Sequence, residues 1–180
     1  IKIFNLLVNN NEPSGKFSLT SKEEKISSSV NQNENIIPED IALILHTSGT
    51  TSKPKMVPLT HLNLCTSAKN IVQTLNLNRS DRCINIMPLF HIHGIVGLLL
   101  SSLFSGGGIF TSTGFNALKF FSWLTVFSPT WYSAVPTMHQ VVLSRADRNS
   151  EIIAKTKLRF IRSSSAPLPS ATMKEIEKTF

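Results

Sequence analysis

Apolar runs and amphipathic stretches alternate along most of the chain. Short apolar runs bounded by polar residues and turn signals are typical of buried strands in a parallel sheet, whereas longer stretches with apolar residues three and four apart are typical of helices. The strands are predicted at residues 41–45, 82–87, 109–111, 130–134 and 158–161. The helices are predicted at about residues 61–75, 95–104, 116–127, from Pro136 onward and from residue 170 to the end. This order predicts an α/β fold with a doubly wound, mostly parallel sheet.

Three residues mark expected helix starts. Thr60 and Ser170 are predicted N-caps, because their hydroxyls can accept a backbone N–H of the first turn, and Pro136 suits the first helical position. The helix at 61–75 is expected to present one mostly apolar stripe at three- and four-residue spacing. That stripe contains Leu62, Cys65, Ala68, Lys69, Val72 and Leu75.

Residues 1–39 differ from the rest of the chain in composition. After a short apolar start at residues 3–8 they are rich in Asn, Ser, Lys and Glu, and such a tract cannot bury a core. We therefore expect a polar surface loop or linker at 1–39 and a globular domain at 40–180. The first residue is not Met and no signal-peptide pattern follows, so the chain is expected to be an internal piece of a longer protein.

The composition argues against several classes of protein. Its net charge is +7 at pH 7, but no basic run is interleaved with aromatic residues, so no nucleic-acid partner is expected. The most apolar stretch, 95–104, is shorter than the roughly 20 residues that cross a bilayer, so no membrane span is expected. Cys65 and Cys83 form no disulfide or metal-ligand pattern, which favours an intracellular compartment.

A hydroxyl-rich stretch follows the first predicted strand. Backbone N–H groups and hydroxyls at the end of a strand can line an anion-binding concavity, and lysines supply charge for phosphate oxygens. The sequence therefore favours a phosphate-binding loop, whose candidate residues are Thr47, Ser48, Gly49, Thr50, Thr51, Lys53 and Lys55. The alternative is a Ser/Thr-rich surface loop with two solvated lysines. The loop differs from the usual P-loop, because Pro54 follows Lys53 where that pattern needs Ser or Thr.

Two further loops follow predicted strands. His91 and His93 lie two residues apart after the strand at 82–87, but no third ligand is near, so no metal site is expected. Packed or capping histidines are the alternative there. Residues 162–168 follow the strand at 158–161, and they could form either a binding loop or an ordinary turn between a strand and a helix.

These loops resemble segments of one enzyme family. Residues 47–56 are similar to the phosphate-binding signature of the adenylate-forming synthetases, although Ser52 and Met56 stand where that family usually has glycine. Pro88 to Gly94 resembles the Pro-x-Phe-His-x-x-Gly segment of acyl-CoA synthetases, and residues 163–168 resemble their Ser-Gly-Ala-Ala-Pro-Leu segment. Within the family, the resemblance is closer to the oxalate-CoA ligases. It covers four segments, at residues 46–52, 88–94, 131–137 and 159–163.

The resemblance implies a two-step reaction. A carboxylate attacks the α-phosphate of ATP, bound with Mg²⁺, and coenzyme A then displaces AMP from the acyl-adenylate. The phosphate loop would stabilise the β- and γ-phosphates, and His91, beside the carboxylate, is the candidate catalytic residue. The adenine and acyl pocket is implied at His93, Gly94, Arg162, Ser163, Ser164, Ser165, Ala166 and Pro167. Because many relatives have glycine at position 164, the Ser164 hydroxyl would narrow the pocket and favour a small acid such as oxalate.

The resemblance also implies that residues 40–180 are part of a large N-terminal AMP-binding domain. The segments that bind Mg²⁺ and ribose, and a C-terminal domain with a catalytic lysine, would lie downstream. We therefore expect the isolated piece to be inactive and the parent to be a cytoplasmic or peroxisomal ligase for a small carboxylic acid. Two alternatives stay open: a non-catalytic nucleotide-binding module from a truncated paralogue, and a ligase for 4-coumarate-like or fatty acids. The oligomeric state is left unknown.

Overall fold

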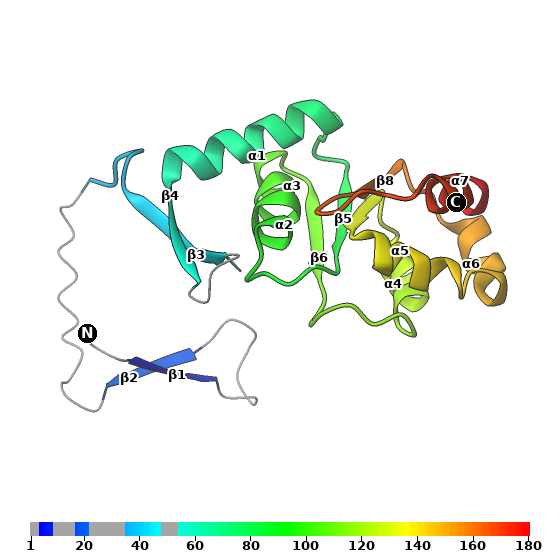
Figure 1. Ribbon diagram of the computed structural model, residues 1–180, viewed down its shortest axis with the longest axis horizontal. Coiled ribbons are helices and arrows are strands. Elements are labelled where there is room, and N and C mark those ends of the chain that lie inside the picture. Colours follow the sequence, from blue (N-terminus) through cyan, green and yellow to red (C-terminus); the bar gives the residue numbers. More distant parts are fainter. Residues whose placement is uncertain (1–3, 9–16, 22–34, 48–53) are drawn as a thin grey trace. The chain divides into compact units, whose positions relative to one another are not determined.

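A computed structural model describes residues 4–8, 17–21, 35–47 and 54–180 of the chain. The chain divides into two units, residues 1–36 and 37–180. The first unit contains an antiparallel pair of strands, β1 (Phe4–Val8) and β2 (Phe17–Ser21), which are coloured blue in Figure 1. These strands were not predicted from the polar composition of the tract, although Phe17 and Leu19 alternate with polar residues as strand residues do. The predicted domain boundary after residue 39 stays a prediction.

The second unit is built on a four-stranded parallel sheet, which confirms the α/β class. Its strands are ordered β6-β5-β7-β8. Their bounds are β5 (Arg82–Asn85), β6 (Gly108–Thr111), β7 (Trp131–Ala134) and β8 (Phe160–Ser163). All four residues of β7 are buried, as expected for a strand with neighbours on both sides and helices on both faces.

Helices connect the strands and cover both faces of the sheet. Figure 1 shows α1 to α3 in green on one side of the strands and α4 and α5 on the other. The first group is α1 (His61–Leu75), α2 (Ile92–Gly94), the π-type turn η1 (Ile95–Leu100) and α3 (Ser101–Phe104). The second group is α4 (Phe120–Phe127), α5 (Pro136–Leu143), the 3₁₀ turn η2 (Asp147–Asn149), α6 (Ser150–Lys155) and α7 (Ser170–Thr179).

The alternation of side chains along β5 and β7 creates two cores. Cys83 and Trp131 face one side of the sheet and pack with Leu98 of η1. Their neighbours Ile84 and Tyr132 face the other side, where they pack with the aromatic residues of α4. Because successive residues of a strand point to opposite faces, each strand supports both helical layers at once.

The predicted strand at 41–45 was wrong in its pairing. Strand β3 (Ile41–Thr47) pairs antiparallel with β4 (Lys55–Thr60), and it does not enter the parallel sheet. The physical reason is the length of the connection, because a parallel crossover needs about a dozen residues and a hairpin needs far fewer. Leu43 and Leu45 are half-buried on one face, whereas Ile44 on the other face is 52% exposed.

The observed helix starts agree only partly with those predicted from the sequence. Thr60 caps α1 as predicted, and its Oγ1 accepts from the Asn63 N–H while Asn63 Oδ1 accepts from the Thr60 N–H. Pro136 is the first residue of α5, also as predicted. The prediction for Ser170 was wrong, because extended Pro169 occupies the N-cap and Ser170 is already helical. Throughout the described residues, every helix is too short or too polar to span a membrane.

Candidate functional site

The carboxyl ends of β5, β7 and β8 meet at one edge of the sheet. Asn85 ends β5, Ser133 and Ala134 end β7, and Arg162 is the next-to-last residue of β8. The loop after β5 brings His93 to the same edge. In open α/β sheets this edge is where ligands bind, because the loops that follow the strands converge there.

Gly94 allows the histidine loop to fold tightly. A Cβ atom at position 94 would lie 2.3 Å from the Pro88 carbonyl oxygen, which is closer than any side chain permits. Asn85 fixes the same loop, since its Nδ2 donates to the Gly94 carbonyl at 3.3 Å and its Oδ1 accepts from the Met87 N–H at 3.0 Å. The loop therefore holds both histidines in fixed positions relative to β5.

The two histidines of this loop have different environments. His91 is exposed and caps α2, because its Nδ1 accepts a hydrogen bond from the His93 N–H at 3.1 Å. His93 is only 4% exposed. His93 Nε2 lies 2.7 Å from Ser133 Oγ, and His93 Nδ1 lies 3.1 Å from Ser165 Oγ. The structure thus gives His91 the geometry of a capping histidine and embeds His93 among hydroxyls.

Burial sets the charge of His93. Loss of water, followed by the positive charge of Arg162, lowers the pKa of His93 from 6.5 to about 4. The ring is therefore neutral at physiological pH, with one nitrogen that donates and one that accepts.

Arg162 is the cation of the site. Its Nη1 donates to Ser133 Oγ at 3.3 Å and its Nη2 donates to Ser164 Oγ at 3.4 Å. Burial lowers the pKa of Arg162, but a guanidinium remains charged at physiological pH. The ion pair found among the described residues joins Arg159 to Asp81, and no described carboxylate pairs with Arg162. The site thus holds a partly buried guanidinium whose described partners are neutral hydroxyls.

The remaining residues of the predicted acyl pocket follow β8. The Ser164 N–H donates to the Ala134 carbonyl at 3.1 Å, which fixes the loop to the end of β7. Ser165 has a left-handed backbone with a φ of 72°. Ala166 and Pro167 are exposed, and the buried Ser163 Oγ has no hydrogen-bond partner among the described residues.

Most of the predicted phosphate loop lies outside the described residues, namely Ser48, Gly49, Thr50, Thr51 and Lys53. Thr47 and Lys55 are described, and they are paired across the hairpin at the last position of β3 and the first of β4. Both are exposed. In the part of the chain that the structure describes, no hydrogen bond joins them to His93 or Arg162, so only the histidine and β8 loops are brought together.

Two residues of the site were missed by the sequence analysis. Ser133 contacts both His93 and Arg162, and the signal for it is a serine inside an otherwise apolar strand. His139 lies on α5, and its Nδ1 is 3.3 Å from the Tyr132 hydroxyl. No periodicity marks His139, because its helix is short. Among the described residues there is no group of three or more His, Cys, Asp or Glu that could hold a metal ion.

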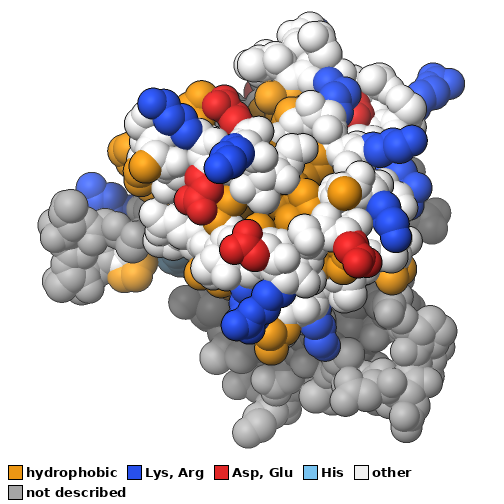
Figure 2. All heavy atoms as spheres, turned by 90° about the vertical axis from the view of Figure 1, so that its right-hand side faces the viewer, with side chains coloured by type: hydrophobic (Ala, Val, Ile, Leu, Met, Phe, Trp, Pro, Cys, Tyr) orange, Lys and Arg blue, Asp and Glu red, His pale blue; other side chains and the backbone are white. Residues whose placement is uncertain are grey.

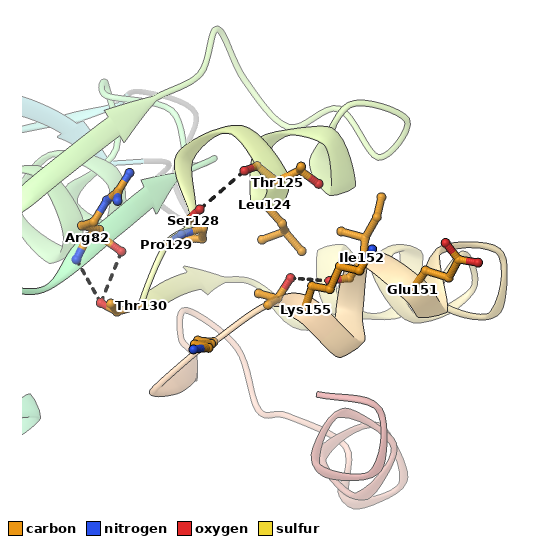
Figure 3. Close-up of a pocket in the computed structure, with 11 residues that line it drawn as sticks. Arg82, Leu124, Thr125, Ser128, Pro129, Thr130, Glu151, Ile152 and Lys155 are labelled. Atoms are coloured by element: carbon orange, nitrogen blue, oxygen red, sulfur yellow. Dashed lines mark hydrogen bonds between the residues drawn. The ribbon is translucent and has the colours of Figure 1, made fainter.

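A separate cavity of about 610 Å³ lies at the opposite ends of the strands. Arg82 and Thr130 line it near the starts of β5 and β7, and Figure 3 shows it between α4 and α6. It contains none of the predicted site residues. On the face that Figure 2 shows, Lys and Arg side chains are scattered among acidic and apolar ones rather than gathered into a stripe.

Comparison with known proteins shows which family the chain matches. The family model described as AMP-binding enzyme matches residues 5–180. An oxalate–CoA ligase of Arabidopsis thaliana is 46% identical over 145 residues, which cover 79% of this chain and 28% of that protein. An oxalate–CoA ligase of Saccharomyces cerevisiae is 43% identical over 141 residues, which cover 78% of this chain and 25% of that protein. The chain spans about a quarter of the length of these relatives.

Solved structures agree with the fold. A malonyl-CoA ligase product complex with methylmalonyl-CoA and AMP bound has a TM-score of 0.71 and 28% identity, covering 79% of this chain and 31% of that chain. ATP-bound MatB from Rhodopseudomonas palustris has a TM-score of 0.70 and 28% identity, covering 79% of this chain and 27% of that chain.

Proposed function

The chain belongs to the AMP-binding enzyme family, and from that membership we propose that the full-length protein is an ATP-dependent carboxylate–CoA ligase for oxalate or another small acid. The observation that carries the substrate class is Arg162, a partly buried guanidinium whose described partners are two serine hydroxyls.

A small dicarboxylic acid would complete the site around Arg162. Taking a guanidinium partly out of water costs free energy unless an anion and good hydrogen bonds compensate, and a carboxylate can accept two parallel N–H bonds from it. Oxalate has two carboxylates, so one can bind Arg162 while the other is activated. The surrounding hydroxyls of Ser133, Ser164 and Ser165 make this region polar, which disfavours a fatty or aromatic acid.

The proposed reaction has two balanced steps. A carboxylate oxygen forms a bond to the α-phosphorus of ATP while the bond to pyrophosphate breaks. The thiolate sulfur of coenzyme A then forms a bond to the acyl carbon, and the bond to AMP breaks. The proposed role of the loop that Thr47 and Lys55 flank is to bind the phosphates, with Mg²⁺ entering alongside ATP. No described side chain is assigned to Mg²⁺.

The proposed roles of the histidines follow from their contacts. His91 Nδ1 already accepts the His93 N–H, so Nε2 is the ring nitrogen left to hydrogen-bond the substrate carboxylate. His91 thus remains the proposed catalytic residue. Neutral His93 lies between Ser133 and Ser165 and positions those hydroxyls. Gly94 and residues 162–167 form the proposed adenine and acyl pocket.

The test is pyrophosphate release by the full-length protein with ATP and Mg²⁺. Oxalate, malonate, 4-coumarate and a medium-chain fatty acid are compared at equal concentration. We expect release with oxalate above all and little with the last two acids. Preference for 4-coumarate or the fatty acid would contradict the substrate class.

A second candidate is a nucleotide-binding module without ligase chemistry, supported by the match to the AMP-binding model alone. Because the chain spans about a quarter of the length of its relatives, we also propose that the isolated 180-residue chain does not turn over by itself. ATP binding by calorimetry together with silence in the pyrophosphate assay, measured on the full-length protein, would favour the module. Thioester formation by the isolated chain would contradict the proposed inactivity.

A further inference from the structure

We propose that Ser165 donates a hydrogen bond to the carboxylic acid substrate, and that a one-way chain of hydrogen bonds from Arg162 through Ser133 and His93 orients it for this task. The inference rests on the proposed function, because the acceptor is an oxygen of that acid. Ser165 would be the substrate-binding residue, and Ser133 and His93 would be positioning residues.

Arg162 sets the direction of donation along this chain of hydrogen bonds. A guanidinium has only donors, so at the contact of 3.3 Å Ser133 Oγ must accept. Ser133 is fully buried, and its own hydroxyl proton therefore needs an acceptor. Within the described residues the acceptor in reach is His93 Nε2, at the short distance of 2.7 Å. Ser133 therefore donates to His93.

The second contact of His93 then follows from its tautomer. A neutral imidazole carries one N–H, and Nε2 is occupied as an acceptor. The proton must lie on Nδ1, which can donate to Ser165 Oγ at 3.1 Å. Ser165 Oγ is consequently an acceptor in this contact, and its own O–H remains available.

The free hydroxyl proton of Ser165 points to a ligand. Ser165 is exposed, and its hydroxyl donates to no acceptor among the described residues. Each donor in such a chain polarises the next, so the final hydroxyl is a stronger donor than an isolated serine. A carboxylate oxygen is the acceptor that gains most from it, because hydrogen bonds to ionised groups are shorter and stronger than neutral ones.

The backbone of Ser165 supports a functional assignment. A φ of 72° is unfavourable for any residue with a Cβ atom, and glycine adopts it freely. Strain of this kind persists where surrounding structure enforces it, and it occurs preferentially at binding sites. A serine here keeps a hydroxyl at a position where the backbone alone favours glycine.

The test uses Ser165→Gly in the full-length protein, because this change removes the hydroxyl and suits the backbone. We expect the KM for the acid to rise about tenfold, the loss of one charge-assisted hydrogen bond, with the KM for ATP unchanged and the melting temperature equal or higher. Ser128→Gly is the matched control. Ser128 also has a left-handed backbone, with a φ of 43°, but it lies at the end of α4 away from the site, so its KM values should stay those of the wild type.

The tautomer of His93 gives a second readout that does not depend on turnover. In protein labelled with ¹⁵N-histidine and assigned with a His93→Gln variant, we expect a proton on Nδ1 and none on Nε2. A proton on Nε2 would overturn the hydrogen-bond chain. An active wild type with an unchanged KM in Ser165→Gly would overturn the inference alone. A wild type that is silent with every acid would overturn the proposed function and this inference with it.

Discussion

Arg159 and Asp81 form an ion pair of 2.8 Å at the amino-terminal edge of the parallel sheet, away from the candidate site. The Arg159 guanidinium also donates to the carbonyl oxygens of Leu75 and Asn76 at the end of α1. Thr130, directly before β7, donates to Asp81 Oδ1 at 2.8 Å. One buried carboxylate thus joins the starts of β5, β7 and β8 to the end of α1.

Replacing Asp81 by Asn is expected to lower the free energy of unfolding by about 2 kcal/mol, because hydrogen bonds to a buried charge are lost. Denaturant unfolding measures the change, and Asp147→Asn on an exposed turn is the control. Burial alone raises the pKa of Asp81, but hydrogen bonds from Arg159, the Asn78 N–H and Thr130 lower the pKa overall, below 3.8. The stabilisation is therefore present above about pH 3.8 and is lost as the pH falls further, so a difference that persisted at pH values well below 3.8 would contradict this account.

Arg162→Gln is expected to reduce kcat/KM for oxalate about 100-fold, because the proposed contact between a guanidinium and a carboxylate disappears. Arg162→Lys should fall between the wild type and Arg162→Gln, since lysine keeps the charge without the planar pair of N–H groups. Steady-state kinetics of pyrophosphate release measures both. The exposed Arg148→Gln serves as the control for loss of one positive charge. Equal kcat/KM in all four proteins would refute the role of Arg162.

His93 is expected to make the stability of the fold depend on pH. Its pKa is about 4 in the folded protein and 6.5 for the ordinary side chain, so between these values the unfolded state binds more protons. Stability should be fully present above about pH 6.5 and should fall as the pH drops toward 4. His93→Gln removes this part of the slope, on the order of 1 kcal/mol per pH unit, as measured by urea unfolding across that range. His139, whose pKa burial also lowers, accounts for slope that remains. An unchanged slope in His93→Gln would show that the ring is not held neutral by burial.

Gly94→Ala is expected to lower stability by about 2 kcal/mol and to impair activity, because its Cβ would collide with the Pro88 carbonyl and displace the histidine loop. Thermal unfolding and pyrophosphate release measure the two effects. The matched control is Gly108→Ala, where the nearest atom to an added Cβ is the Arg82 Cγ at an ordinary 3.8 Å. If both alanine variants behaved alike, the tight turn at Gly94 would not be what fixes the loop.

The sequence was sufficient for the parallel sheet, because buried strands such as β7 are short, mostly apolar runs between turn residues. It was not sufficient for the pairing of β3, since a short apolar run does not reveal its partner. It placed the buried face of α1 only in part. Ala68, Val72 and Leu75 of the expected stripe face inward, whereas Leu62 is 51% exposed. The direction of a helix stripe depends on neighbours that periodicity does not specify.

The candidate site was predicted in part. The loops after β5 and β8 were identified, since motifs at strand ends are visible in the sequence. The different environments of His91 and His93 were not, because burial depends on how Gly94 folds the loop against β5. Ser133 was missed because its one signal, a serine inside an otherwise apolar strand, does not show which residues lie opposite it.

Strand β7 has consequences for how the site moves. It is hydrogen-bonded to β5 on one side and β8 on the other, and its four residues are buried, so its amide hydrogens should exchange with solvent only when the whole unit opens. The backbone of Ser133, on this strand, is therefore expected to move only on the slow timescale at which the whole unit opens. Because Ser133 contacts both His93 and Arg162, β7 is the fixed reference that holds these two side chains in place.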